Sequence, residues 1–303
     1  MLRLKGITKS FGQRSALADV SFEVERGRLT GFVGGNGAGK TTAMRIILNV
    51  LRADHGTVTL DGRPVTGTEL RSFGYMPEER GLYPKMTLVD QLVYLARLHG
   101  IDKPAATQRA ETLLERLGLA ERSKDKLESL SLGNQQRVQI AAALVHDPDV
   151  LILDEPFSGL DPLAVDEVLS VIAEHAERGI PVLFSSHQLD VVERLCDDLV
   201  IIADGQIKAA GAREVLRAEH TGNRWSLQGL GDVGWIRDIP GVTVVELAGD
   251  STLFDAPEHV AQQAAARAVA EYGLRGFSRL HPTLGEIFRD IVVDRTDADG
   301  EAA

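Results

Sequence analysis

Cysteine and long apolar runs are nearly missing from this chain of 303 residues. The single cysteine, Cys196, has no second thiol with which to form an internal disulfide. It lies in an amphipathic segment, where a buried small hydrophobe is the simplest interpretation. This cysteine usage favours a reducing cytoplasm. No stretch approaches the roughly 20 apolar residues that a membrane-spanning helix needs, so any work at a membrane requires a partner.

An excess of positive charge is also missing. The chain has 33 Lys and Arg against 44 Asp and Glu, a net charge of −11. Proteins that bind nucleic acids usually carry clustered basic residues that neutralise phosphates. We therefore expect no nucleic-acid partner, and a solvated surface is the simplest interpretation of the acidic balance.

The order of the predicted elements indicates an α/β fold with more than one domain. The first part is rich in strands, the middle is mostly helical, and buried strands alternate with helices after residue 150. Such alternation predicts a parallel, doubly wound sheet. Strands are expected at 2–7, 20–24, 29–33, 56–62, 150–153, 182–185 and 199–203, and helices at 42–51, 88–98, 107–117, 162–177 and 189–195.

The composition changes near residue 220, where glycines separate short strand-like pieces. We expect one domain over residues 1–220 and a small α+β domain over 221–293. Residues 294–303 are acidic and small, and are predicted to form a flexible tail.

A glycine-rich motif after the apolar run at 29–33 indicates a nucleoside-triphosphate site, the P-loop. Its glycines let backbone N–H groups face phosphate oxygens, Lys40 adds a charge near the β- and γ-phosphates, and Thr41 offers a hydroxyl to Mg²⁺. A glycine-rich turn can also serve packing alone, but the strand–loop–helix context favours the nucleotide. The candidate phosphate-binding residues are Gly34, Gly35, Asn36, Gly37, Ala38, Gly39, Lys40, Thr41 and Thr42.

Two adjacent carboxylates end the apolar run at 150–153. The carboxyl ends of strands in a parallel sheet face the ligand crevice. Asp154 is therefore a candidate for holding Mg²⁺, and Glu155 faces the place where a water must be activated to attack the γ-phosphate. A strand that merely ends at a charged loop is the simpler alternative, but it leaves the following turn, 156–161, unexplained.

Two further motifs complete a pattern. Leu130-Ser131-Leu132-Gly133-Asn134-Gln135-Gln136-Arg137 precedes a helical run, where helix-terminal N–H groups can receive an anion. Ser185-Ser186-His187 follows a buried strand. Together with the P-loop, the two acids and the turn Ser158-Gly159-Leu160-Asp161, these motifs have the order and separations of the nucleotide-binding subunit of ATP-binding-cassette (ABC) transporters. The chain resembles that family over roughly residues 1–220.

The resemblance implies a P-loop NTPase cassette. This fold has a parallel-sheet core, an amino-terminal antiparallel β subdomain and an α-helical signature subdomain, here followed by the small α+β domain. It also implies that Ser131, Gly133 and Gln135 contact the γ-phosphate bound by a second subunit, with Asp161 among the nucleotide-contacting residues. Two copies, most simply a homodimer, are then expected to close head-to-tail around two molecules of ATP with Mg²⁺.

The resemblance assigns three more roles near the phosphates. Glu155 is similar to the general base of the family, and His187 to the switch histidine that hydrogen-bonds the γ-phosphate. A lone histidine is more often structural, but its place after a buried strand favours the catalytic role. Phe11 occupies the position of an aromatic ring under adenine, and the alternative is that it fills the small β core.

Two positions depart from the family pattern. The signature usually has two consecutive glycines, whereas here Leu132 precedes Gly133 and Asn134 follows it. Glu78 stands where the family has a glutamine that reaches Mg²⁺ and senses the permease. A carboxylate can also bind a hard cation, but it adds negative charge near the phosphates. The simpler alternative for Glu78 is a solvated turn.

Finer resemblance favours one subgroup of the family. The segment 77–83, the signature spelling and the carboxy-terminal run 281–288 are similar to ATPase subunits of exporters for sodium, drugs or other small molecules. Such subunits pair with separately encoded membrane permeases, which implies a cytoplasmic protein held at the inner face of the membrane.

The competing hypotheses are a soluble cassette protein in translation or DNA repair, and a regulatory nucleotide binder without turnover. The carboxy-terminal domain is interpreted as a scaffold or regulatory piece.

Overall fold

The computed structural model describes residues 1–79 and 81–293. Contacts divide the chain into two compact units, the first from Met1 to Arg213 and the second from Glu214 onward. The tail predicted at 294–303 lies outside the described residues. All the candidate site residues predicted from sequence fall in the first unit.

The first unit begins with an antiparallel sheet. Its strands are, in spatial order, β2 (Arg14–Val24), β1 (Leu2–Phe11), β4 (His55–Leu60) and β5 (Arg63–Pro64). Leu2 and Leu4 of β1 are buried opposite Val24 and Phe22 of β2. The exposed residues alternate with them, as the two-residue period of a half-buried strand requires.

A mixed six-stranded sheet forms the centre of this unit. Its strands are, in spatial order, β10 (Gln206–Ala212), β9 (Asp198–Ala203), β3 (Leu29–Val33), β8 (Val182–Ser186), β7 (Val150–Leu153) and β6 (Phe73–Met76). All are parallel except β10, which pairs antiparallel with β9 at the edge. The strands β3, β7 and β8 are buried along their whole length, because a parallel sheet is covered on both faces.

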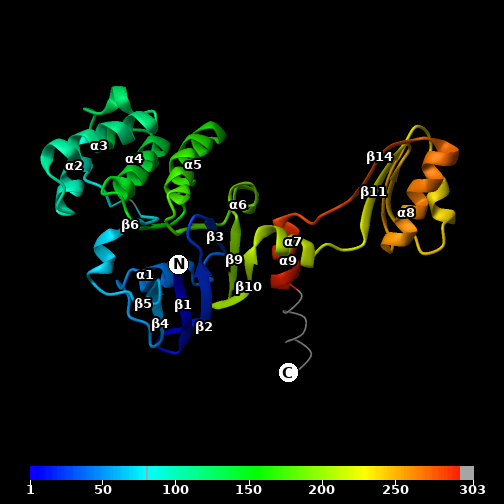
Figure 1. The fold of residues 1–303 in the computed structure, drawn as a ribbon, viewed down its shortest axis with the longest axis horizontal. Helices are drawn as coiled ribbons and strands as arrows, with labels where there is room; N and C mark the ends of the chain where they lie inside the picture. The colour runs from blue at the N-terminus through cyan, green and yellow to red at the C-terminus, as the bar shows by residue number, and fades with distance from the viewer. Residues whose placement is uncertain (80, 294–303) are drawn as a thin grey trace. The chain divides into compact units, whose positions relative to one another are not determined.

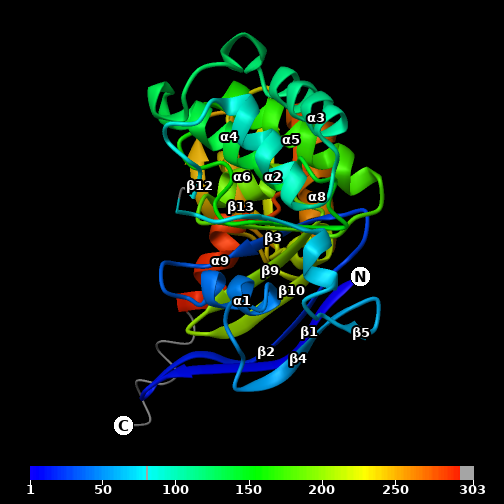
Figure 2. The ribbon, with the colours of Figure 1, turned by 90° about the vertical axis from the view of Figure 1, so that its left-hand side faces the viewer.

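Helices cover this sheet and form a separate layer. They are α1 (Lys40–Ile47), α2 (Leu88–Leu98), α3 (Lys103–Arg116), α4 (Leu132–Leu144), α5 (Pro162–Glu177) and α6 (Leu189–Leu195). Figure 1 shows α2, α3, α4 and α5 grouped on the side of the sheet away from β1 and β2, and Figure 2 shows α1 between the two sheets. The apolar face of α1 joins both sheets in one core, because Met44 and Ile47 pack with residues of β1 and β3.

Polar side chains set where four of these helices begin. Thr87, Asp102, Ser131 and Asp161 precede α2, α3, α4 and α5, and each accepts a hydrogen bond from the backbone N–H three residues later. Such caps satisfy N–H groups that have no partner within the helix. The helix expected at 42–51 ends earlier, at Ile47, because Asn49 adopts a left-handed φ of 53°.

The second unit is a small α+β fold. Its antiparallel sheet has the order β12 (Thr243–Ala248), β13 (Ser251–Asp255), β11 (Arg224–Gly229) and β14 (Leu274–Arg279), and its helices are α7 (Arg213–Glu219), α8 (Glu258–Arg267) and α9 (Leu284–Val293). Its core joins Trp225 and Phe254 of the sheet to Ala261 and Ala264 of α8. The parallel core, the antiparallel sheet, the helical layer and this α+β part confirm the predicted architecture.

Candidate functional site

The P-loop joins the buried strand β3 to α1, and close packing explains some of its glycines. A Cβ on Gly34 would overlap the carbonyl oxygen of Ile202, whereas a Cβ on Gly35 would meet no atom within 4 Å. Gly37 and Gly39 adopt left-handed φ values of 78° and 111°, which residues with a Cβ rarely adopt. Gly34 and Gly39 therefore shape the loop itself, while Gly35 leaves open space beside it.

A cavity of about 660 Å³ lies beside this loop and gathers most of the predicted site residues. Much of its wall comes from segments that follow the carboxyl ends of the parallel strands β3, β6, β7 and β8, as expected for a ligand site in such a sheet. The rest comes from the antiparallel strands β1 and β2. It is lined by Phe11, Arg14, Ala16, Gly35, Asn36, Gly37, Gly39, Lys40, Thr41, Thr42, Glu78, Asp154, Glu155 and His187. Gly34 and Ala38 belong to the loop but do not line the cavity.

Lys40 is a buried cation in this cavity, with only 8% of its surface exposed. Its Nζ donates to the carbonyl oxygens of Gly34 at 2.6 Å and Gly35 at 3.3 Å. It pairs with no carboxylate among residues 1–79 and 81–293. A buried ammonium without a counter-ion is costly, so this site is suited to an anion such as a phosphate.

Asp154 carries a buried carboxylate that is only half satisfied. It is 1% exposed, its Oδ1 accepts a hydrogen bond from Ser185, and its Oδ2 has no partner in the part of the chain that the structure describes. Burial, together with the negative charge of Asp154, raises the pKa of nearby Tyr75 above its ordinary value. Thr41 and Glu78 line the same cavity, so that this set of oxygen donors fits a hard divalent cation such as Mg²⁺.

Glu155 is held in an unusual conformation beside His187. Its φ is 54°, a left-handed value that is uncommon for a residue with a side chain. The Nδ1 of His187 donates to Oε2 of Glu155 at 2.9 Å. A carboxylate and an imidazole therefore lie side by side at the cavity, and both are groups that can serve in general acid–base chemistry.

Two side chains occupy the mouth of the cavity. Phe11 is 53% exposed, so it does not fill the small β core. Arg14 lines the cavity close to the loop, since a Cβ on Gly37 would lie 3.8 Å from its guanidinium. The sequence reasoning missed Arg14, although its place three residues after Phe11, across a tight turn, is a signal that could have identified it.

The predicted signature residues do not line this cavity. Ser131 caps α4, and Gly133 lies against the carbonyl oxygen of Gly159, at 3.3 Å from an ideal Cβ. Asp161 caps α5 by accepting from Ala164 N at 2.9 Å. Ser131, Gly133 and Asp161 therefore lie at the start of α4 and in the turn before α5.

Gln135 has a local contact that the sequence did not predict. Its Nε2 donates to the carbonyl oxygens of Leu127 at 3.2 Å and Leu130 at 3.1 Å. The side-chain amide therefore satisfies the turn before α4 within its own chain.

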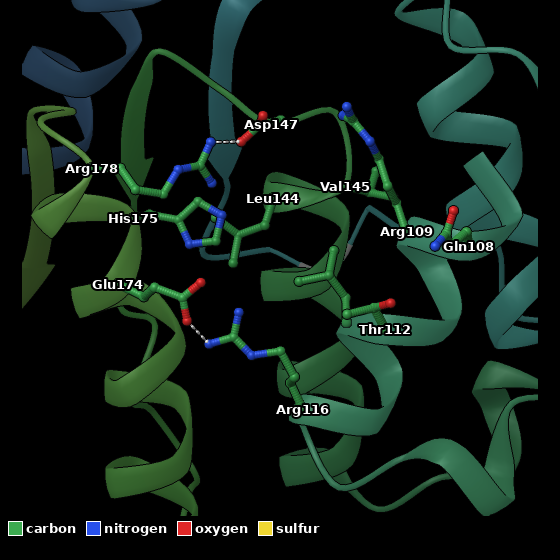
Figure 3. A pocket seen from close by; sticks show the side chains of 11 residues that line it. Gln108, Arg109, Thr112, Arg116, Leu144, Val145, Asp147, Glu174, His175 and Arg178 are labelled. Atoms are coloured by element: carbon green, nitrogen blue, oxygen red, sulfur yellow. Dashed lines mark hydrogen bonds and ion pairs between the residues drawn. The ribbon is translucent and has the colours of Figure 1, made fainter. Parts of the chain in front are cut away.

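A second cavity, of about 290 Å³, lies between α3, the end of α4 and α5. Figure 3 shows Arg116 directed at Glu174 and Arg178 directed at Asp147, with His175 between the two pairs. These charges neutralise one another across the cavity. None of the predicted site residues lines it.

Known proteins match both units. The family described as ABC transporter matches residues 17–158, and the C-terminal domain of DrrA1-3-like ATP-binding proteins matches residues 211–292. The uncharacterised ABC transporter ATP-binding protein YhaQ of Bacillus subtilis is 36% identical over 289 residues, covering 95% of this chain and 97% of that protein. The linearmycin resistance ATP-binding protein LnrL of B. subtilis is 36% identical over 216 residues, 70% of each chain. A solved ATP-binding subunit of an ABC transporter is 33% identical with a TM-score of 0.67, covering 72% of this chain and 92% of that one.

Proposed function

Because the chain belongs to the ABC transporter family as an ATP-binding subunit with ATPase activity, we propose that two copies close around two ATP–Mg²⁺ and power a separately encoded permease. One observation carries this proposal. The cavity beside the P-loop brings together Lys40, Asp154, Glu155 and His187, while the signature residues lie elsewhere on the same chain. A nucleotide regulator without turnover would not need this acid–base pair.

The residues of the cavity divide the work of hydrolysis. The P-loop N–H groups and Lys40 hold the β- and γ-phosphates, and Glu155 accepts a proton from the attacking water. The water oxygen bonds to the γ-phosphorus, the bond from that phosphorus to the bridging oxygen of ADP breaks, and the proton moves to Glu155. Thr41, Asp154 and Glu78 would hold Mg²⁺, which supplies charge neutralisation on the phosphates.

His187 acts next to the base. Its Nδ1–H is donated to Glu155, which orients the carboxylate. For Nε2 to donate at the same time to a γ-phosphate oxygen, both ring nitrogens must carry protons.

The signature surface completes the site of another copy. Ser131 and Gly133 lie at the start of α4, where backbone N–H groups and the helix dipole favour an anion. We assign this surface, with Asp161 nearby, to the γ-phosphate bound at the P-loop of the second subunit. Each ATP site is then shared between two chains in a head-to-tail dimer.

Mixing two defective variants tests the shared site. In the Glu155→Gln background, Lys40→Ala removes the phosphate-binding charge and Ser131→Arg blocks the signature surface. Each variant alone is expected to remain monomeric with ATP, whereas their mixture retains one intact site per heterodimer and should form dimers. Size-exclusion chromatography with light scattering measures whether the proteins are monomers or dimers. A mixture as monomeric as its components would contradict a shared site.

The transport role rests on a membrane partner. Within the described residues, no helix is long and apolar enough to span a bilayer. Because ATP-binding subunits of this family work with a membrane permease, we assign substrate passage to that permease and infer that this chain acts at its cytoplasmic face. We infer export because the relative LnrL is described as a resistance protein. The second unit, similar to the DrrA-like C-terminal domain, serves as a scaffold or regulatory part.

Purification of the tagged full chain from membranes tests this role. The expected result is co-purification of a multi-spanning permease, together with ATP hydrolysis that changes when the permease is reconstituted. Recovery only with ribosomes or DNA would favour the alternative, a soluble cassette ATPase of translation or repair.

A further inference from the structure

We propose that Ser185 and Gln136 are positioning residues that hold the backbone of Glu155 from both sides. This inference rests on the proposed role of Glu155 as general base. Neither residue lines the nucleotide cavity. Both act through Glu155, and Ser185 also contacts Asp154. The geometry that assigns this role consists of four hydrogen bonds between buried groups.

The backbone of Glu155 needs such support. Its left-handed φ of 54° is unfavourable for a residue with a Cβ. Strand β7 ends at Leu153. Just after it, the N–H of Asp154 donates to the carbonyl oxygen of Met76 in β6, and this is the last backbone hydrogen bond to the sheet. The sheet therefore provides no backbone partner for the N–H of Glu155.

Ser185 supplies the partner on the N–H side. It is fully buried in β8, next to β7 in the sheet, and its Oγ accepts from the N–H of Glu155 at 2.9 Å. The same hydroxyl donates to Oδ1 of Asp154 at 2.5 Å. One hydroxyl thus orients both acids of the site, because its acceptor and donor functions are used at the same time.

Gln136 supplies the partner on the carbonyl side. It is 5% exposed and lies in α4, and its Nε2 donates to the carbonyl oxygens of Glu155 at 2.9 Å and Pro156 at 3.1 Å. Glu155 O also accepts from Ser158 N at 3.2 Å, which closes the turn. Buried donors and acceptors of this kind are costly to leave unpaired, so the pairs resist a change of conformation at Glu155.

The consequence is that the carboxylate of Glu155 is presented to His187 and to the attacking water from a fixed backbone. Without either support, the peptide can relax toward a common backbone conformation and carry the carboxylate away. Misplacement of a reacting group by about 1 Å can lower a rate on the order of 100-fold. Nucleotide affinity should change little, because the phosphates are held mainly by the P-loop and Lys40.

The test compares Ser185→Ala and Gln136→Met in the full-length protein. Each is expected to lower kcat by about 10- to 100-fold, with KM for ATP and the affinity for a fluorescent ATP analogue within about threefold of native. Ser185→Thr retains the hydroxyl and should restore most of kcat. A native kcat in Gln136→Met, which does not touch Asp154, would overturn the proposal, and so would loss of nucleotide affinity in step with kcat.

Matched controls remove buried polar groups that do not touch Glu155. Gln139→Met removes a buried amide one turn further along α4, and Thr30→Val removes a buried hydroxyl from the neighbouring strand β3. Gln139 Oε1 and Thr30 Oγ1 have no hydrogen-bond partner among the described residues. Both variants should keep a native kcat, and an equal fall in the controls would show a general effect of core damage and overturn the proposal.

A double variant separates this inference from the proposed function. If Gln136 acts through Glu155, adding Gln136→Met to Glu155→Gln should lower the residual kcat no further. Ser185→Ala is left out of this comparison, because the Ser185 hydroxyl also contacts Asp154. Full additivity would overturn the positioning role. A native rate in Glu155→Gln alone would instead refute Glu155 as base, which is the failure of the proposed function.

Discussion

The Nδ1 of His187 donates to Oε2 of Glu155 at 2.9 Å, although 32 residues separate the two along the chain. Glu155 follows β7 and His187 follows β8, and these strands are parallel neighbours. Their carboxyl ends therefore meet at one edge of the sheet, next to the P-loop that follows β3. This relationship makes the site sensitive to single changes in either side chain.

Replacing Glu155 by Gln should separate nucleotide binding from turnover. The amide keeps the shape of the side chain but cannot accept a proton from water, so we expect kcat to fall by about 10²–10⁴-fold. Affinity for ATP should be retained, and the closed dimer should persist. Steady-state phosphate release and equilibrium binding of an ATP analogue measure the two effects. Hydrolysis at the native rate would show that Glu155 is not the base.

Replacing Glu78 by Gln should leave basal hydrolysis in place. Glu78 lines the cavity with Asp154 and Thr41, and an amide oxygen can also bind a hard cation. Removing one negative charge near the phosphates should strengthen ATP binding and raise the Mg²⁺ concentration needed for half-maximal activity. A titration of Mg²⁺ at fixed ATP tests both effects. Complete loss of hydrolysis would show that the carboxylate is specifically required.

Two neighbouring glycines should respond differently to alanine. A Cβ on Gly34 would overlap the carbonyl oxygen of Ile202, so Gly34→Ala should lower the free energy of unfolding by about 1–3 kcal/mol. Gly35→Ala is its matched control, because open space surrounds that position. Denaturant midpoints of the first unit distinguish the two, and equal midpoints for both variants would contradict the close packing of Gly34.

His146 should make stability depend on pH. Burial, together with the neighbouring charge of His99, lowers the pKa of His146 to about 4, against an ordinary value of 6.5. Its Nε2 lies 3.1 Å from the carbonyl oxygen of Phe73, while its buried Nδ1 has no acceptor among the described residues. Protonation of Nδ1 would therefore bury an unpaired N–H and a charge.

The sign of this effect follows from the two protonation states. The unfolded chain takes up the proton near pH 6.5 and the folded chain only near pH 4, so the stabilisation from neutral His146 is complete above 6.5 and is lost as pH falls to 4. Urea midpoints of His146→Asn should therefore vary less with pH in this window than those of the native protein. The exposed His55→Asn is the control, and identical pH slopes in all three proteins would contradict the prediction.

The sequence predicted the residues of the site that follow buried strands. A run such as 150–153 identifies a strand buried on both faces, and its carboxyl end in a parallel sheet faces the ligand. This reasoning placed Asp154 and Glu155 at the ligand crevice, whereas the role of His187 beside them came from the resemblance to the family. Alternation and turn residues, which are local signals, also predicted a strand-rich beginning and the small α+β part. That the first strands form an antiparallel sheet came from the resemblance to the family.

Side-chain hydrogen bonds across elements could not be predicted in this way. The contact of Gln136 with Glu155 depends on the rotation of α4 about its axis, and that of Ser185 depends on the register of β8 beside β7. Gln135 shows the same limit, because its signature spelling carries no sign that its amide binds the turn before α4. Such contacts arise from packing, which no short motif encodes.

Cys196 gives this protein a practical property for spectroscopy. It is the single cysteine of the sequence, it is buried, and burial raises the pKa of its thiol well above the ordinary value. The thiolate needed to react with maleimide or methanethiosulfonate reagents is therefore scarce and inaccessible. A cysteine introduced at exposed Leu132 would be labelled selectively in the otherwise native chain. Paired spin labels at that position would then report the distance between two subunits directly as nucleotide is added.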